Sequence, residues 1–411
     1  MRNVITNARL ADGRVVDIDV DRGRIVAVTP IGSRSAEGHG DASVVDLGGW
    51  LLLPAMAEPH AHLDKALTAE LVPNPTGDLA GAIEAWVTAA QAGTFAHDDM
   101  VVRIRSAIDK LVFNGVTAIR SHINCGSGAG IRHLLAAQEA IVGYEGLIDI
   151  EFVALTHSPM AGPGSEPNRQ SLRDAIDHGV HLVGGCPHLE ADGVGSIAEA
   201  MSAARSAGLA IDLHVDEMLD PTMLTIRDLA RAVIDTGFDG SVAASHCVSL
   251  GMQPQHVQSA IAREVAEAGI TIVPLPQTNL FLQGRDRPTA TPRGLTAIAA
   301  LREAGVLIAA GADNVQDPFN LVGRSDPLET AALLVMAGHV LPDDAYEMVS
   351  NNVRRAMGLP IVRFEVGDPA DFVAIDAPSI RGAIADAPAD RMVFKAGRLI
   401  ASSATARTLH R

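Results

Sequence analysis

The chain has 411 residues, of which 47% are hydrophobic and 3% aromatic, and its net charge is −17 at pH 7. This charge argues against nucleic acid and against an anionic membrane as partners, because both require basic surface patches. No apolar run approaches the roughly 20 residues of a membrane span, and the N-terminus lacks the apolar segment of a signal peptide. We therefore expect a cytoplasmic globular protein. Its three scattered cysteines predict no disulfide framework.

The N-terminal segment has the character of short β-strands. Apolar residues at 16, 18 and 20 alternate with aspartates, as in a strand with one buried face. Residues 31–43 are rich in Gly, Ser and Ala and predict an exposed loop. Residues 44–48 follow as another short strand.

From residue 51 onward, apolar runs alternate with amphipathic helices. Eight runs are found, at 51–62, 116–123, 147–156, 181–186, 210–217, 242–247, 271–277 and 306–314. The helical candidates are 100–113, 131–142, 170–178, 197–207, 226–236, 255–268 and 294–304. This alternation predicts parallel strands buried on both faces, and eight units predict an α/β fold of the (β/α)8 TIM-barrel type. The alternative is a doubly wound open sheet, which is weakened because no Gly-rich phosphate loop follows the first run.

The C-terminal tail returns to β character. Residues 362–377 contain a turn at 367–369, and residues 391–401 have the pattern of a hairpin. We expect the two chain ends to meet in one small β domain beside the barrel. The predicted domains are 1–54 and 359–411 for the two parts of this small domain, and 55–358 for the barrel.

Polar residues end the apolar runs, at the edge where barrel enzymes place their active sites. His60 and His62 are two residues apart in the first run, so both imidazoles point to the same face of a strand and can reach one metal ion. The polar residues at or just after the other runs are His122 and Asn124, His157, His188 and Glu190, His214 and Glu217, His246, Gln277 and Asn279, and Asp313 and Asn314.

Four of these side chains form a candidate metal-ligand set, since a catalytic metal needs three or four N/O ligands and one position open to water. The set of three imidazoles and one carboxylate is His60, His62, His214 and Asp313. The alternative for Asp313 is a helix N-cap. Glu217 is a candidate proton shuttle or an exposed loop carboxylate. His246 is a candidate to orient or deprotonate water, or a structural histidine.

The motifs PHAHLD at 59–64, HVDE at 214–217, SHCVSL at 245–250 and GADNVQDP at 311–318 resemble the amidohydrolase superfamily in order and spacing. The chain is most similar to the cytosine deaminase-like members over nearly its whole length. The resemblance implies one divalent ion per subunit, Zn or Fe, on the ligand set above. It also implies Glu217 as the proton shuttle, and His246 with Asp313 as the groups that hold and deprotonate the water.

The resemblance to one-metal members agrees with the lysine content. Two-metal amidohydrolases, including phosphotriesterase-like hydrolases, commonly bridge their ions with a carboxylated lysine at the end of the fourth strand, and run 181–186 has no lysine. The chain has three lysines in all, and only Lys65 lies near a strand end. We expect Lys65 to pair with a nearby carboxylate, and the alternative is a position near the mouth of the site.

The implied reaction is hydrolytic deamination, in which metal hydroxide attacks a ring amidine carbon and ammonia is released. The expected partner is a small nitrogen-rich heterocycle: a cytosine-like pyrimidine, a triazine, a purine or a pterin. Cytosine itself is disfavoured, because His157 stands where cytosine deaminase has Gln and Asn314 stands where it has a second Asp. The side chains expected to contact the ring of the substrate are His157, Gln277, Asn279, Asn314, His188 and Glu190. For each of them a structural role is the alternative.

Two other functions stay open at this point. The Asp-Asn pair at 313–314 also resembles N-isopropylammelide amidohydrolase, which expels an alkylamine, although that relative lacks the glutamate of HVDE. A noncatalytic barrel is disfavoured because every proposed ligand and proton-handling residue is present. A homo-oligomer is also left open.

Overall fold

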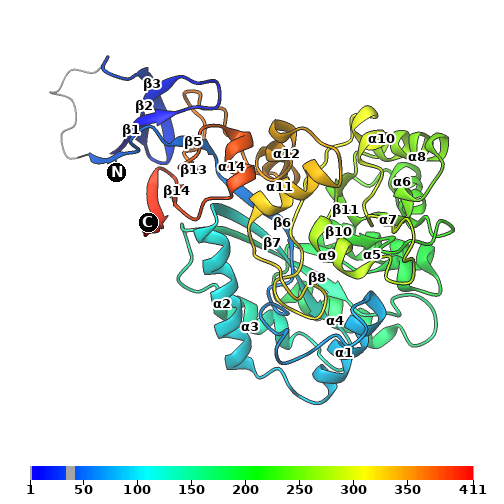
Figure 1. Ribbon diagram of the computed structural model, residues 1–411. Helices are drawn as coiled ribbons and strands as arrows, with labels where there is room; N and C mark the ends of the chain where they lie inside the picture. The colour runs from blue at the N-terminus through cyan, green and yellow to red at the C-terminus, as the bar shows by residue number, and fades with distance from the viewer. Residues whose placement is uncertain (1, 34–41, 411) are drawn as a thin grey trace.

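The computed structural model describes residues 2–33 and 42–410, and its strands form two sheets (Figure 1). One sheet is a barrel of parallel strands surrounded by helices, and the other is built from both ends of the chain. The loop predicted at 31–43 lies mostly outside the described residues.

The barrel sheet has seven strands in sequence order, and every neighbouring pair is parallel. The strands are β6 (Met56–Ala61), β7 (Val116–Cys125), β8 (Asp149–Thr156), β9 (Leu182–Gly184), β10 (Ala210–Val215), β11 (Val242–His246) and β12 (Thr271–Val273). All residues of β6 and β7 are buried. Burial on both faces explains why these strands are apolar almost without interruption.

The predicted eighth run, 306–314, closes the barrel through two isolated parallel bridges instead of a continuous strand. Ile308 bridges to Ile272 on β12, and Asp313 bridges to Ala61 on β6. Between these bridges the carboxylate of Glu58 accepts hydrogen bonds from the backbone N–H of Ala312, at 2.9 Å, and of His60, at 3.1 Å. A buried side chain thus satisfies backbone donors that a regular ladder would pair with carbonyls. The predicted α/β (β/α)8 fold is confirmed.

The first predicted run needs a correction, because residues 51–62 are two strands and not one. β5 (Leu51–Pro54) belongs to the terminal sheet and β6 to the barrel. At the junction, Ala55 donates its N–H to Asp371 and Met56 donates to Gly115. Pro54 has no N–H to continue a ladder. The chain therefore passes from the terminal sheet to the barrel sheet next to the predicted boundary at 54/55. The domain limits themselves stay a prediction.

The helices on the barrel include all seven predicted segments. They are α2 (His97–Phe113), α3 (Arg132–Ala140), α4 (Glu166–Asp177), α5 (Gly193–Ala207), α6 (Thr225–Thr236), α8 (Gln255–Glu267) and α10 (Ile298–Glu303). Helices that the sequence did not predict are α1 (Leu79–Gln91), α7 (Val248–Gly251), α9 (Pro276–Leu282), α11 (Pro327–Met336), α12 (Pro342–Met348), α13 (Asn351–Ala356), α14 (Ile380–Asp386) and the 3-10 turn η1 (Pro187–Leu189). No helix of the described residues is long and apolar enough to cross a bilayer.

The end of the seventh run also differs from the prediction of a strand over 271–277. The chain leaves β12 after Val273, and Pro276 begins helix α9. Proline favours the first turn of a helix, where its missing N–H would be unpaired in any case. Gln277 and Asn279 therefore lie on a helix beyond the strand.

The terminal sheet joins the two ends of the chain, as predicted. Its strands besides β5 are β1 (Arg2–Arg9), β2 (Val15–Asp21), β3 (Arg24–Pro30), β4 (Ser43–Asp46), β13 (Phe372–Ile375), β14 (Arg391–Lys395) and β15 (Arg398–Ser402). β13 pairs antiparallel with β5, with Ile375 opposite Leu51. The sheet has its own apolar cluster, in which Ile5 and Ile18 pack with Phe372.

Candidate metal centre

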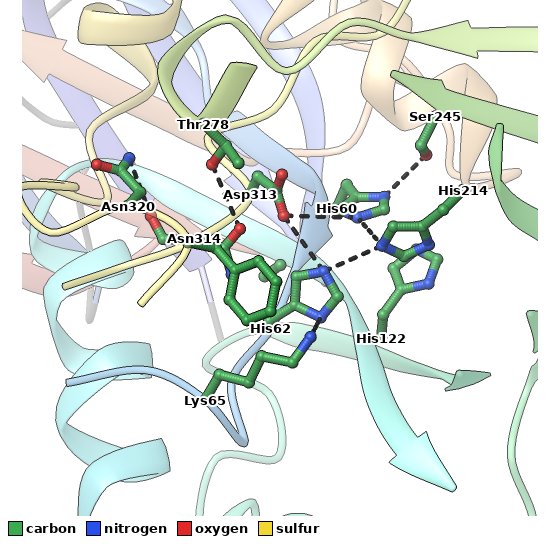
Figure 2. A network of polar contacts seen from close by, with 12 residues as sticks. His60, His62, Lys65, His122, His214, Ser245, Thr278, Asp313, Asn314 and Asn320 are labelled. Atoms are coloured by element: carbon green, nitrogen blue, oxygen red, sulfur yellow. Dashed lines mark hydrogen bonds and ion pairs between the residues drawn. The ribbon is translucent and has the colours of Figure 1, made fainter. Parts of the chain in front are cut away.

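Three imidazoles converge at the C-terminal edge of the barrel (Figure 2). His60 and His62 lie at the end of β6 and its continuation, and His214 lies on β10. The Nε2 of His214 is 3.1 Å from the Nε2 of His60 and 3.2 Å from the Nε2 of His62. The alternation of side chains along β6 brings both of its histidines to one face.

The carboxylate of Asp313 completes the cluster from the segment that closes the barrel. Its Oδ1 lies 3.2 Å from the Nε2 of His62 and 3.7 Å from the Nε2 of His60. The backbone of Asp313 is left-handed, with φ 67°, and its N–H donates to the carbonyl of His60. The next helix in the chain, α11, begins at Pro327, so Asp313 is not a helix cap.

A cation fits this cluster. Burial, followed by the neighbouring imidazoles, holds the pKa of His60 and of His214 well below the ordinary value, so both rings are neutral at pH 7 and offer lone pairs. Neither buried carboxylate oxygen of Asp313 has a hydrogen-bond partner. Among the described residues, three sets of side chains have metal-binding geometry, and all three include His60: His60, His62 and Asp313; His60, His214 and His246; and His60, His122 and Asp212. Unpaired buried acceptors around a small space are what a divalent ion satisfies.

A chain of polar contacts at the Nδ1 of His60 sets the orientation of its ring. Its Nδ1 is 2.8 Å from the hydroxyl of Ser245, which donates in turn to Asp212 at 3.2 Å. Because this hydroxyl is a donor to Asp212, it accepts the Nδ1 proton of His60. The Nε2 of His60 is thereby left with a lone pair that faces the cluster.

His246 and Glu217 lie on the open side of the cluster. The Nδ1 of His246 is 3.1 Å from the Oδ1 of Asn279 and 3.6 Å from the Oε1 of Glu217. Its Nε2 is 3.9 Å from the Oδ2 of Asp313. Glu217 is 6% exposed and is therefore not a loop carboxylate in solvent. Burial, and then the charge of Asp313, raise the pKa of Glu217 well above its ordinary value, which favours its protonated form.

A cavity of about 430 Å³ opens above these side chains. His62, His214, Asp313, Glu217 and His246 all contribute to its lining, so the candidate ligands and proton-handling groups face one space. Leu79, Ile83, Trp86, Leu155 and Phe319 supply apolar walls. An apolar cavity with a few convergent polar groups is the usual form of a small-molecule site.

Two of the six expected substrate-reading residues, His157 and Asn314, line this cavity. The amide of Asn314 is held on both sides, since its Oδ1 accepts from Thr278 at 3.3 Å and its Nδ2 donates to Asp317 at 2.8 Å. Its orientation is therefore fixed before a ligand arrives.

The other four lie outside the cavity lining and contact protein groups. Asn279 contacts His246, and Gln277 donates to Thr330 at 2.7 Å. His188 contacts the carbonyl of His214 at 3.1 Å, and Glu190 accepts from the N–H of Met160 at 2.9 Å. Asn279 and His188 thus contact histidines of the site, whereas Gln277 and Glu190 contact residues outside the cavity lining.

Sequence reasoning left Trp86 and Phe319 out of the site, and it placed Lys65 near the site mouth only as an alternative to a carboxylate pair. The structure does not support the expected pairing of Lys65 with a carboxylate: within the described ranges no acidic side chain forms an ion pair with it. Its Nζ lies 3.3 Å from the Nδ1 of His62 and 4.7 Å from the centre of the Phe319 ring. The available signals were the position of Lys65 directly after the HxH motif and of Trp86 at the end of GAIEAW.

A (β/α)8 barrel with histidines and an aspartate clustered at the C-terminal ends of its strands defines a hydrolase of the metal-dependent class. The chain belongs to the amidohydrolase family, whose model matches residues 74–401.

The relatives of this chain include deaminases and amine-releasing hydrolases. A pterin deaminase from Rhizobium rhizogenes is 32% identical over 393 residues, covering 93% of this chain and 87% of the relative. The structure of a 5-methylcytosine deaminase from Klebsiella pneumoniae, with bound 5-fluorocytosine, superposes with a TM-score of 0.87 at 26% identity and covers 99% of both chains. An N-isopropylammelide isopropylaminohydrolase from Burkholderia multivorans superposes with a TM-score of 0.82 at 26% identity, covering 98% of both.

Proposed function

We propose that this protein is a metal-dependent hydrolytic deaminase of an amino-substituted nitrogen heterocycle. The proposed ligands of one divalent ion, Zn or Fe, are His60, His62, His214 and Asp313. The observation that carries the proposal is the convergence of three imidazoles and the carboxylate of Asp313 beside the buried Glu217. Of these side chains, all but His60 line one cavity. When bound, a divalent ion acts as a Lewis acid that makes a coordinated water more acidic.

His246 orients and deprotonates the attacking water. Its Nδ1 donates to Asn279, so its Nε2 carries a lone pair on the side of Asp313, 3.9 Å from that carboxylate. A water held between these two groups can pass a proton to either. Its oxygen is then free to attack the ring carbon that bears the amino group.

Glu217 supplies the complementary acid. Its protonated carboxyl donates to the ring nitrogen next to the reacting carbon, which makes that carbon more electrophilic. The water oxygen forms the new C–O bond, and the C–N bond to the amino group breaks. One proton of the water leaves with the amino group as ammonia, and the other returns to Glu217 as the product takes its oxo form. The ring product carries an oxo group in place of the amino group, so one water is consumed for each ammonia released.

A fused two-ring aminoheterocycle of the pterin type is the proposed substrate class. Its support is the 32% identity to a pterin deaminase and a cavity of about 430 Å³ with aromatic side chains in its wall. The second candidate is release of an alkylamine from an N-substituted triazine, favoured by the likeness to an N-isopropylammelide isopropylaminohydrolase. Glu217 favours the deaminase, because the resemblance to N-isopropylammelide amidohydrolase does not extend to the glutamate of HVDE.

The test is ammonia release by the metal-loaded enzyme from aminopteridines, aminopyrimidines, aminopurines and aminotriazines, with amine detection on N-alkylated triazines in parallel. We expect ammonia from an aminopteridine and its loss in Glu217→Gln. The exposed Glu84 on α1 provides the matched control, Glu84→Gln, which should behave as wild type. Amine from an alkylated triazine without ammonia from any other ring would replace the first function by the second.

A further inference from the structure

The side chain of Lys65 is a buried cation in the wall of the cavity. It is 5% exposed, and its Nζ faces the Phe319 ring at 4.7 Å and the Trp86 ring at 5.9 Å. Both distances are within the range of cation–π contacts. Figure 2 shows the side chain reaching toward His62 beneath Asn314. All three side chains line the cavity, so the ammonium lies between two aromatic faces at its edge.

One polar neighbour cannot satisfy the three donors of the Lys65 ammonium. The nearest such atom is the Nδ1 of His62, at 3.3 Å. Within residues 2–33 and 42–410, no carboxylate forms an ion pair with Lys65. An ammonium has three donors, and leaving them unpaired in a buried site is costly.

The positive charge of Lys65 nevertheless acts on a carboxyl group that it does not contact. Burial raises the pKa of Asp317, and the charge of Lys65 opposes this rise. A carboxyl group beyond contact distance thus interacts with the ammonium without occupying its donors. What is lacking is an acceptor inside the cavity, and a bound ligand can supply one.

We propose that Lys65 is a specificity-determining residue that binds an oxo group of the substrate, while Trp86 and Phe319 pack against the ring. This inference rests on the proposed function and narrows its substrate class. The substrate is an aminoheterocycle that carries a second, non-reacting oxo group, as a carbonyl or as its ionised enolate form, within reach of Lys65. Rings without that oxo group leave the ammonium unpaired and bind more weakly.

The experiment measures equilibrium binding of non-reacting products, so it does not depend on turnover. The probes are 2,4-dioxopteridine and 2-oxopteridine, with uracil and 4-oxopyrimidine as a single-ring pair. Binding is followed by fluorescence of Trp86 in a Trp50→Phe background, since the chain has two tryptophans and Trp50 packs in the terminal sheet. The variants are Lys65→Met and, as the matched control, Lys110→Met at an exposed position of α2. Metal content and melting temperature are measured for each.

We expect wild type to bind the dioxo member of at least one pair about tenfold or more tightly than the mono-oxo member, as a charge-assisted hydrogen bond implies. In Lys65→Met this preference should disappear through weaker binding of the dioxo ring alone, at unchanged metal content, and Lys110→Met should keep it. Equal weakening of both rings in Lys65→Met would overturn the proposal, and so would failure of wild type to prefer or to bind either dioxo probe.

If Lys65→Met does not fold, failure of the wild type to prefer a dioxo ring still overturns the proposal. The result of the Lys65 binding test can also be distinguished from the result of the ammonia-release test. A dioxo preference that depends on Lys65, with no ammonia released from any ring, would refute the proposed function and keep the role of Lys65. Ammonia release with no dioxo preference would keep the proposed function and refute the role of Lys65.

Discussion

The Oδ1 of Asn279 lies 3.1 Å from the Nδ1 of His246, and this contact sets the tautomer of the ring. An amide oxygen can only accept, so the Nδ1 of His246 carries the proton. Its Nε2 is therefore an acceptor on the side of Asp313. Asn279, which the sequence suggested as a substrate contact, is better described as the residue that prepares His246.

This relationship makes Asn279 testable. We expect Asn279→Leu to lower kcat/KM by about 10- to 100-fold, the value of one lost buried hydrogen bond to a proton-transfer group. Asn279→Asp keeps an acceptor and should retain most activity, with its pH profile displaced because the imidazolium is stabilised. Kinetics over pH and metal analysis check this. A loss of bound metal in Asn279→Leu would instead make Asn279 part of the metal centre.

The metal content of purified variants should distinguish a proposed ligand from the proposed acid. Asp313→Ala removes a ligand, so we expect it to lose both bound metal and turnover. Glu217→Gln should keep the metal and lose turnover, because an amide cannot deliver the proton. Metal analysis of the two purified variants is the measurement. Equal metal content in both would contradict the ligand assignment.

Ser245 should act on metal affinity through His60. Its hydroxyl connects the Nδ1 of His60, at 2.8 Å, to Asp212, and loss of such an outer contact typically weakens metal binding about 10- to 100-fold. We expect this loss in Ser245→Ala, measured by competition with a chelator. Ser106→Ala on α2, where the hydroxyl bonds only to its own helix, is the control and should match wild type.

Glu58 should impose a pH dependence on stability. Burial is the largest cause that raises its pKa, from 4.5 to about 8, so the folded state holds a proton that the unfolded state releases. Stability from this group is complete below pH 4.5 and is lost as pH rises toward 8. We expect urea unfolding to show a steeper decline over this window in wild type than in Glu58→Gln, which cannot titrate. Parallel pH profiles would mean that Glu58 stays ionised in the folded protein.

The sequence itself predicts the barrel and most of the candidate metal centre. Hydrophobic runs of strand length between amphipathic helices reflect local periodicity, which is present in the sequence without any tertiary information. The alternation of side chains in a strand brings His60 and His62 together for the same reason. His214 and Asp313 could be added because all parallel strands of a barrel end at one edge.

What the tertiary structure alone decided involves residues far apart in the chain. Ser245 meets the imidazole of His60 across 185 positions, and Glu58 reaches the backbone of Ala312 across 254. No local pattern encodes such contacts, so the closing segment was expected as a regular strand, and Asn279 and Gln277 as ligand contacts. The clearest case is Lys65: its sequence position suggested an ion pair, whereas packing enclosed it between Phe319, Trp86 and the ring of His62. A side chain's partners are determined by which surfaces the fold buries together, and burial is a property of the whole chain.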